Sequence, residues 1–107
     1  MVTTASRSRD YLRKQNWTAE CVEKKVFNIR RDLFGFADVI AFSQGRGILL
    51  VQAYVKGKEK AHEELTPTRN IVILNWIKSG GLFQHHIWSK VGKRGKRKHW
   101  EVSVQSF

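Results

Sequence analysis

Apolar and polar residues alternate along this chain with two different periods, and each period predicts a different kind of element. Residues 3–15 show helical spacing, with Tyr11 and Leu12 as apolar anchors opposite an arginine-rich face. Residues that can cap the start of this helix are Thr3, Thr4 and Ser6. Strand-like patterns follow at residues 17–27, 36–42 and 48–55. The first half of the chain is therefore predicted to form one helix and three strands.

A second helical pattern covers residues 66–81, with Thr66 as the predicted N-cap, Pro67 at the first helical position and Gly80 as the C-terminal stop. Its expected buried stripe consists of Ile71, Leu74 and Ile77. Two more strand patterns follow, at residues 82–88 and 99–107. The basic segment between these strands is predicted to form an extended hairpin.

These elements predict an α/β fold, a mixed β-sheet flanked by helices in the order α-β-β-β-α-β-β. The segment 43–47 contains two glycines and is typical of a tight turn, so the strands 36–42 and 48–55 should pair antiparallel. The strand 48–55 is apolar on both faces and should lie centrally in a covered sheet. A length of 107 residues favours a single domain, 1–107.

Composition supports a folded chain in a reducing compartment. Hydrophobic residues make up 41% of the sequence, and its one cysteine, Cys21, excludes an internal disulfide. We therefore expect Cys21 to be a small core residue. No apolar run approaches the length of a membrane span, and the N-terminal residues have no apolar signal-peptide core. These features predict a cytoplasmic protein with no membrane partner.

The charge balance indicates a polyanionic partner. Lysine and arginine number 20 against 9 aspartates and glutamates, a formal net charge of +11. An excess of this size favours binding to nucleic acid, to a membrane surface or to an acidic protein. No basic amphipathic helix stands out in the sequence, so nucleic acid is the favoured partner.

Two polar residues interrupt the two neighbouring apolar strands. Asp38 shares its strand face with Ile40 and Phe42, and Gln52 shares its face with Leu50. An unpaired buried carboxylate costs several kcal/mol or more, so Asp38 requires an explanation. If the two faces coincide, Asp38 and Gln52 form a small cluster of oxygen atoms, which is the kind of site that Mg²⁺ or Mn²⁺ prefers.

The stretches "RRDLFGFADVIAF" and "GILLVQAYV", with the order of elements around them, resemble the PD-(D/E)xK nuclease superfamily. More narrowly, they are similar to small phage and bacterial nuclease-like proteins related to Holliday junction resolvases. The resemblance covers most of the chain and implies a restriction-endonuclease-like core. It also implies a metal-dependent DNA endonuclease in a bacterial or phage-infected cell, with branched DNA as a candidate substrate and a homodimer as the expected assembly.

The resemblance assigns candidate roles position by position. Asp38 matches the first acid of the motif, and Gln52 matches the second acid as an amide. Tyr54 stands where the motif has lysine, so Lys56, on the same strand parity, is the candidate assisting lysine if the strand continues. Glu23 is a candidate third metal ligand. The departures at residues 52 and 54 leave open an alternative function, a catalytically inactive nucleic-acid-binding module on the same scaffold.

Ordinary structural roles for these residues also stay open. Asp38 can cap backbone groups or pair with Arg30 or Arg31, and Gln52 can pair with neighbouring backbone. Asp32 is more typical of a turn residue and is the next candidate ligand. Two further candidates, Glu23 and Lys56, are more typical of surface charges than of site residues.

The predicted basic hairpin is the second functional feature. Trp88 and Trp100 flank it and should anchor it to the core. If about five of its charges contact phosphates, log K should fall with log salt at a slope near −4 to −5. A solvated loop is the competing interpretation, and nothing in the segment indicates reading of bases. The candidate DNA-binding residues are Lys90, Lys93, Arg94, Lys96, Arg97 and Lys98.

Overall fold

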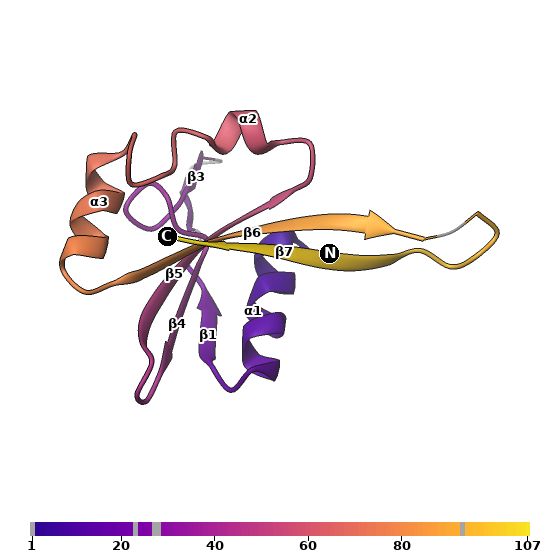
Figure 1. Ribbon diagram of the computed structural model, residues 1–107, viewed down its shortest axis with the longest axis horizontal. Helices are drawn as coiled ribbons and strands as arrows, with labels where there is room; N and C mark the ends of the chain where they lie inside the picture. Colours follow the sequence, from indigo (N-terminus) through magenta and orange to yellow (C-terminus); the bar gives the residue numbers. More distant parts are fainter. Residues whose placement is uncertain (1, 23, 27–28, 93) are drawn as a thin grey trace.

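The computed structural model describes residues 2–22, 24–26, 29–92 and 94–107. Its main feature is a five-stranded sheet with the strand order β1-β4-β5-β6-β7 (Figure 1). The strands are β1 (Thr18–Cys21), β4 (Val39–Ser43), β5 (Gly47–Val55), β6 (Leu82–Val91) and β7 (His99–Ser106). Strands β5 and β6 pair parallel and the other neighbours pair antiparallel, so the predicted mixed sheet is confirmed.

Two helices cover opposite faces of this sheet. Helix α1 (Thr4–Lys14) packs through Ala5 and Leu12 on one face. Helix α3 (Ile71–Lys78) packs through Ile73 against Leu50 and Phe83 on the other face. A short helix, α2 (Glu59–His62), lies between β5 and α3 in the chain. None of these helices, within the described ranges, is long and apolar enough to cross a membrane.

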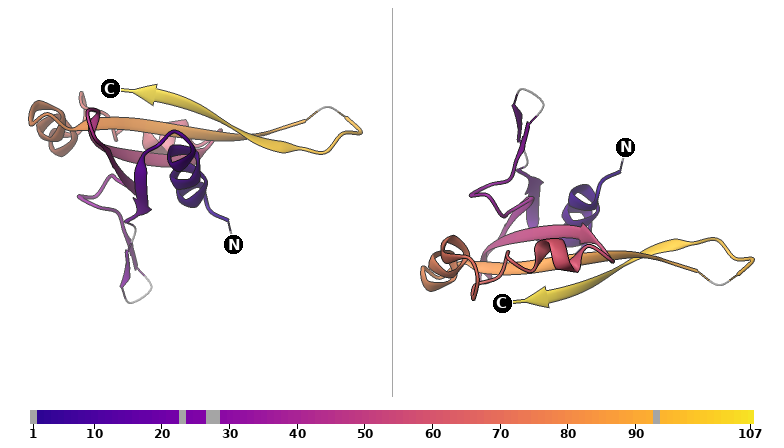
Figure 2. Two further views of the ribbon diagram at one scale, coloured as in Figure 1. Left: turned by 90° about the horizontal axis from the view of Figure 1, so that it is seen from below. Right: turned by 90° about the horizontal axis from the view of Figure 1, so that it is seen from above.

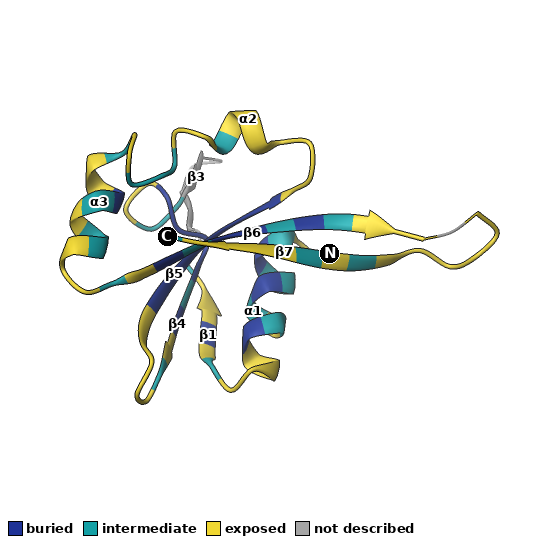
Figure 3. Cartoon of the chain, in the orientation of Figure 1, coloured by how far each residue is buried: buried dark blue, intermediate teal, exposed yellow. Residues whose placement is uncertain are grey.

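Strand β5 lies at the centre of the sheet, as predicted. Its residues 49–54 are all buried, and Figure 3 shows this strand in dark blue along most of its length. The turn before β5 has Gly45 and Gly47 at positive φ, which confirms the predicted glycine turn. Because parallel strands need a crossover connection, the segment 56–81 carries the chain over the sheet between β5 and β6.

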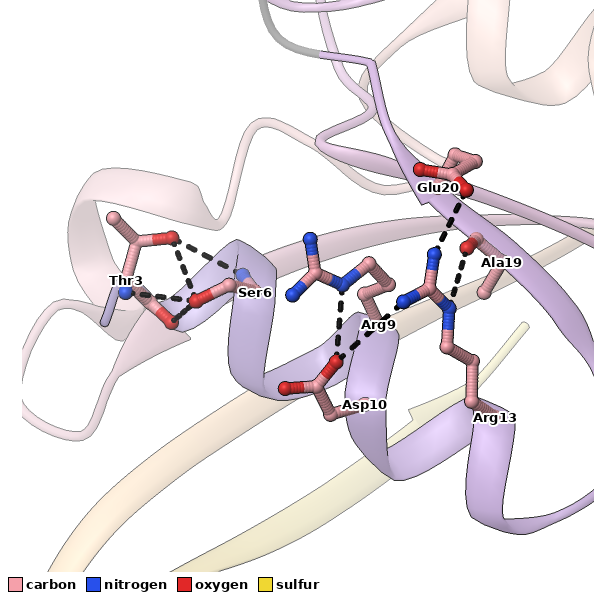
Figure 4. Close-up of polar contacts among 7 residues, drawn as sticks. All are labelled: Thr3, Ser6, Arg9, Asp10, Arg13, Ala19 and Glu20. Carbon is pink, nitrogen blue, oxygen red and sulfur yellow. Dashed lines mark hydrogen bonds and ion pairs between the residues drawn. The ribbon is translucent and has the colours of Figure 1, made fainter. Parts of the chain in front are cut away.

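Helix α1 is fixed at both ends by polar contacts (Figure 4). Thr3 is its N-cap, and the Thr3 side chain and the Ser6 backbone form one half of a reciprocal capping box. Near the other end, Arg13 donates to the carbonyl of Ala19 at 3.0 Å and pairs with Glu20 at 2.8 Å. These contacts join α1 to β1, so the helix has a set position on the sheet.

The predicted strand 17–27 is wrong as a single element. Strand β1 ends at Cys21, and a separate two-stranded sheet follows, formed by β2 (Lys24–Val26) and β3 (Ile29–Arg31). Figure 2 shows this hairpin on the same side of the main sheet as α1. Cys21 is exposed, which contradicts the prediction of a core residue. The reason is that β1 is an edge strand and that α1 covers it only around Ala19.

The predicted start of the second long helix is also wrong. Residues 66–69 form a turn, and the N-cap is Asn70, whose Oδ1 accepts from the N–H groups of Val72 and Ile73. The inward face therefore carries Ile73, Trp76 and Ile77, while Ile71 is 66% exposed. The predicted stop is confirmed, since the helix ends at Lys78 and Gly80 has a φ of +95°.

Candidate functional site

Asp38 directly precedes β4 and is held between two strands. Its N–H donates to the carbonyl of Val51 at 2.8 Å, and its own carbonyl accepts from Val22 at 2.9 Å. The side chain is buried, and its Oδ2 accepts the N–H of Ala53 at 2.9 Å. The carboxylate thus serves the backbone of β5, which is one of the ordinary roles considered for this residue, and this bond also fixes its orientation.

Gln52 lies in the middle of β5 and is only 5% exposed. Its Oε1 has no hydrogen-bond partner among the described residues. A buried acceptor left in this state costs about 1–3 kcal/mol unless a water or a cation reaches it. The ordinary role of Gln52, pairing with neighbouring backbone, therefore does not account for this oxygen within the described chain.

Asp38 and Gln52 line the same hollow, which has a volume of about 330 Å³. Strand pairing explains their proximity, because Val39 pairs with Val51 and one further step places residue 38 opposite residue 52. Asp32 and Ala53 line the same hollow. We name this the acid–amide hollow, and its first wall offers carboxylate and amide oxygens.

The opposite wall of the acid–amide hollow is the start of α1, with Thr3, Thr4 and Ala5. Thr4 bridges to the sheet through a long hydrogen bond, 3.5 Å, from its hydroxyl to the carbonyl of Ala53. The first N–H groups of a helix have no intrahelical acceptor and lie at the positive end of its dipole. Sequence reasoning treated these threonines only as caps, because their place beside Asp38 depends on tertiary packing.

Tyr54, at the lysine position of the motif, lies outside the acid–amide hollow. It lines a second hollow, where its ring stacks on His62 with centroids 4.1 Å apart. His85 donates through Nε2 to the carbonyl of Leu65 at 2.6 Å, so its Nδ1 accepts the Tyr54 hydroxyl at 3.3 Å. Burial lowers the pKa of His85, which favours this neutral form.

Lys56 is not among the residues that line the acid–amide hollow. Strand β5 ends at Val55, so the continued strand that would direct Lys56 toward Gln52 does not form. Lys56 is exposed in the following turn, and its N–H donates to the carbonyl of Trp88 at 2.8 Å. Glu23 lies outside the described residues. Within the described ranges, no three His, Cys, Asp or Glu side chains form a metal-binding group.

The basic hairpin forms between β6 and β7 and extends away from the sheet body along the long axis of the molecule (Figure 1). Its described candidates are all exposed, namely Lys90, Arg94, Lys96, Arg97 and Lys98. Lys93 lies outside the described residues. Trp88 is 7% exposed and anchors the hairpin to the core, as predicted. Trp100 is partly buried and carries Arg7 over its ring at 4.4 Å.

A serine–histidine pair on the α1 face has the composition of a catalytic dyad but lies inside the core. Ser8 and His86 are both 0% exposed. Trp88 donates to Ser8 Oγ at 2.9 Å, Ser8 donates to His86 Nδ1 at 2.9 Å, and His86 Nε2 donates to Gln84 Oε1 at 2.9 Å. Every polar group in this hydrogen-bond network has a partner, so we interpret the network as structural.

Comparison with protein-family models found no match, and neither the curated proteins nor the solved structures include one that matches this chain. The functional interpretation therefore depends on the geometry of the acid–amide hollow, on the charge of the hairpin and on the sequence resemblance.

Proposed function

We propose that this protein is a metal-dependent DNA endonuclease that hydrolyses phosphodiester bonds, with branched, resolvase-type DNA as one possible substrate class. The observation that carries the proposal is the acid–amide hollow, where a carboxylate and a buried amide oxygen without a described partner line one space. The resemblance of these strands to the PD-(D/E)xK superfamily supports the same reaction.

The donor set of this hollow fits a hard divalent cation. Asp38 and Gln52 would hold Mg²⁺ or Mn²⁺, with Asp32 as a nearby further oxygen donor and Glu23 as a predicted ligand from outside the described residues. A cation of this kind supplies Lewis-acid polarisation of the phosphate and lowers the pKa of a bound water. The Oε1 of Gln52, which has no hydrogen-bond partner among the described residues, is the structural reason to expect a cation at this position.

The residues of the chain have separate tasks in this proposal. The Ala53 N–H orients the Asp38 carboxylate, and burial of Gln52 keeps its amide in a fixed environment. The N–H groups of Thr4 and Ala5, at the start of α1, would donate to phosphate oxygens across the hollow. Lys56 stays a prediction for the cation that steadies the attacking hydroxide, and it would have to reach back from the turn after β5.

DNA is the proposed partner because the exposed charges of the basic hairpin are suited to a phosphate backbone. Backbone contacts position a duplex without reading its sequence, which is compatible with recognition of DNA shape. The resemblance also implies a homodimer, located in the cytoplasm of a bacterial or phage-infected cell. Sedimentation of the free protein and of its DNA complex tests the homodimer.

The decisive experiment compares Asp38→Asn with wild type on linear and branched DNA in Mg²⁺ and in Mn²⁺. Asparagine keeps an oxygen that can accept the Ala53 N–H but loses the charge, so the fold should persist. Cleavage should fall by at least about a hundredfold, because the metal loses the carboxylate that matches the first acid of the motif. The control is Glu64→Gln, at an exposed surface position before α3, which should cleave like wild type. Equal cleavage by Asp38→Asn and wild type would reject the proposed role of Asp38.

A second candidate function is the catalytically inactive nucleic-acid-binding module. Two observations favour it, namely the amide at residue 52 and the engagement of Tyr54 with His85 in a separate hollow. This module would bind DNA in a salt-dependent way and would cleave neither linear nor branched DNA with any divalent metal. The cleavage experiment above therefore also separates the two functions.

A further inference from the structure

A third hollow, of about 590 Å³, lies between α1 and the strands of the basic hairpin. This volume falls in the range of pockets that hold small organic groups. We name it the aromatic groove. Its main lining residues are Arg7, Tyr11, Lys14, Trp88, Trp100 and Val102.

The inner part of the aromatic groove is held by ring and hydrogen-bond contacts. Tyr11 meets the Trp88 ring edge-on at 6.2 Å, and the Trp88 indole N–H is already engaged by the buried Ser8. Trp100 lies further out on β7 and is only partly buried. Because the Arg7 guanidinium lies over the Trp100 ring, the groove presents a cation–aromatic stack at its mouth.

The aromatic groove is lined by two cations, Arg7 and Lys14, and by two acids, Asp10 and Glu101. Asp10 pairs with Arg9 at 3.0 Å, and Glu101 contacts His99 at 2.9 Å. Arg7 and Lys14 have no carboxylate partner in the part of the chain that the structure describes. Two cations therefore remain available at the rim, beside the exposed charges of the hairpin.

We propose that the aromatic groove receives an unpaired nucleobase from DNA bound on the basic hairpin, an inference that rests on DNA being the partner in the proposed function. Proteins bind single-stranded nucleic acid with aromatic rings and arginine planes, on which the bases stack, and with nearby cations that contact the phosphates. A base in a duplex is already stacked on its neighbours, so the groove selects a base that has left the helix.

The position of the groove connects it to the acid–amide hollow. Arg7 follows Thr4 by three residues of α1, which is about 4.5 Å along the helix axis. Thr4 lines the acid–amide hollow and Arg7 lines the aromatic groove. An unpaired base held at Arg7 would therefore place its neighbouring phosphates near the start of α1. The substrate class that fits is DNA with an unpaired nucleotide close to the cleaved bond, as at a branch point or a single-stranded end.

The test measures binding without cleavage, in EDTA, by fluorescence anisotropy. The two probes are a fully paired duplex and the same duplex with one unpaired adenine at its centre. Wild type should bind the probe with the unpaired base about tenfold more tightly, since one stacked base contributes on this scale. Equal affinities for the two probes would overturn the inference.

Variants of the groove residues test whether the preference for the unpaired base arises in the aromatic groove. Trp100→Leu should reduce the tenfold preference to about twofold or less while leaving affinity for the paired duplex nearly unchanged. Arg7→Gln, which does not alter the packing of the sheet, should have the same effect and serves if the Trp100 variant folds poorly. The matched control, Arg97→Gln at the hairpin, should weaken both probes equally and keep the preference. A preference that survives both Trp100→Leu and Arg7→Gln would overturn the assignment to this groove.

These outcomes are separate from the outcome of the cleavage experiment. A lost preference with intact Mg²⁺-dependent cleavage rejects the aromatic groove alone. A clear preference with no cleavage in any divalent metal supports the groove and rejects the nuclease proposal in favour of the binding module. Absence of binding to both probes would reject the DNA partner, and the inference would fall with it.

Discussion

Asp38 has a structural role that is chemically compatible with its proposed role as a metal ligand. One carboxylate oxygen, Oδ2, accepts a backbone N–H of β5, and the same residue lines the acid–amide hollow. A hydrogen bond to a carboxylate orients it without removing its charge, in the way that outer partners orient metal ligands. For this reason the structural role of Asp38 does not compete with the proposed functional role, and Asn is the informative replacement.

Gln52 offers a test that adds a charge instead of removing one. In Gln52→Glu, a buried carboxylate beside Asp38 should lower the melting temperature in EDTA, because no described cation lines the hollow to pair with it. Mn²⁺ should then raise the melting temperature of the variant well above its effect on wild type. Affinity for Mg²⁺ should increase by about tenfold as the ligand charge rises. Thermal unfolding with and without metal measures the first two effects.

The matched control for this prediction is Gln105→Glu, which adds the same charge at an exposed position of β7. Its melting temperature should respond to Mn²⁺ like that of wild type. If Gln52→Glu is also insensitive to Mn²⁺, the acid–amide hollow does not hold a cation.

We expect the folded protein to lose stability in acid because of His86. Burial lowers its pKa from 6.5 to about 4, and the neutral ring fits the acceptor and donor on its two sides. The unfolded chain therefore binds a proton that the folded chain does not bind between these pH values. Stability from this residue is complete above about pH 6.5 and declines as the pH falls toward 4, by roughly 3 kcal/mol in total.

Urea denaturation at several pH values checks this expectation. The slope of the unfolding free energy between pH 6.5 and 4 should be steeper in wild type than in His86→Gln, which cannot take up the proton. The variant should be less stable at pH 7, because the hydrogen bonds with Ser8 and Gln84 are disturbed. Parallel slopes in the two proteins would show that His86 does not control the acid response.

At the level of elements, hydrophobic period and turn residues predicted the main strands well. Strand β5 and the glycine turn before it were predictable because burial on both faces and positive φ each leave a local sequence signal. The start of α3 could not be predicted in this way, because the sequence allows a helix to begin either at Thr66–Pro67 or at Asn70. Only the packing of Ile73 in the core selects Asn70. The exposure of Cys21 depends on which strand forms the edge, which the sequence of β1 does not specify.

The candidate site also has features that the sequence predicts and features that it does not. The proximity of Asp38 and Gln52 followed from a tight turn and strand parity, both of which are local properties. The wall formed by α1 and the placement of Tyr54 in another hollow depend on how separate elements pack. Arg7 and Trp100 were likewise missed as a pair, because nothing local joins a helix near the start of the chain to its last strand.

The cap of α3 provides an element-level prediction. Asn70→Ala removes the acceptor of two backbone N–H groups and should lower the unfolding free energy by about 1 kcal/mol. Asn75→Ala, at an exposed position inside the same helix, is the control and should be neutral or slightly stabilising. Chemical denaturation of the three proteins measures the difference. Equal stability of Asn70→Ala and wild type would contradict the assignment of Asn70 as the cap.

On the scale of the whole molecule, the positive charge is unevenly placed, since the exposed cations of the hairpin lie on an arm directed away from α3 (Figure 2). We expect DNA affinity to depend on this arm. In Lys96→Gln/Arg97→Gln, the slope of log K against log salt should become shallower by about 2, because each phosphate contact contributes close to −0.9. DNA binding measured over a range of salt concentrations gives this slope.

The control removes two charges elsewhere, in Lys60→Gln/Lys78→Gln on α2 and α3. Both double variants lower the formal net charge of +11 by the same amount, so a general effect of charge would change both slopes equally. Wild-type slope in the control and a shallower slope in the hairpin variant would assign phosphate contact to the arm. The same slope in both double variants would contradict it.

The crossover between β5 and β6 has a consequence for how the molecule assembles. Short connections join β4 to β5 and β6 to β7, so these two antiparallel pairs can form early. The parallel pair β5–β6 can form only after segment 56–81 has brought the two strands together. Closing a long loop is slow, because its entropy cost is incurred before the contacts that stabilise it have formed. We therefore expect the rate-limiting step of folding to be the meeting of two preformed hairpins at the β5–β6 seam.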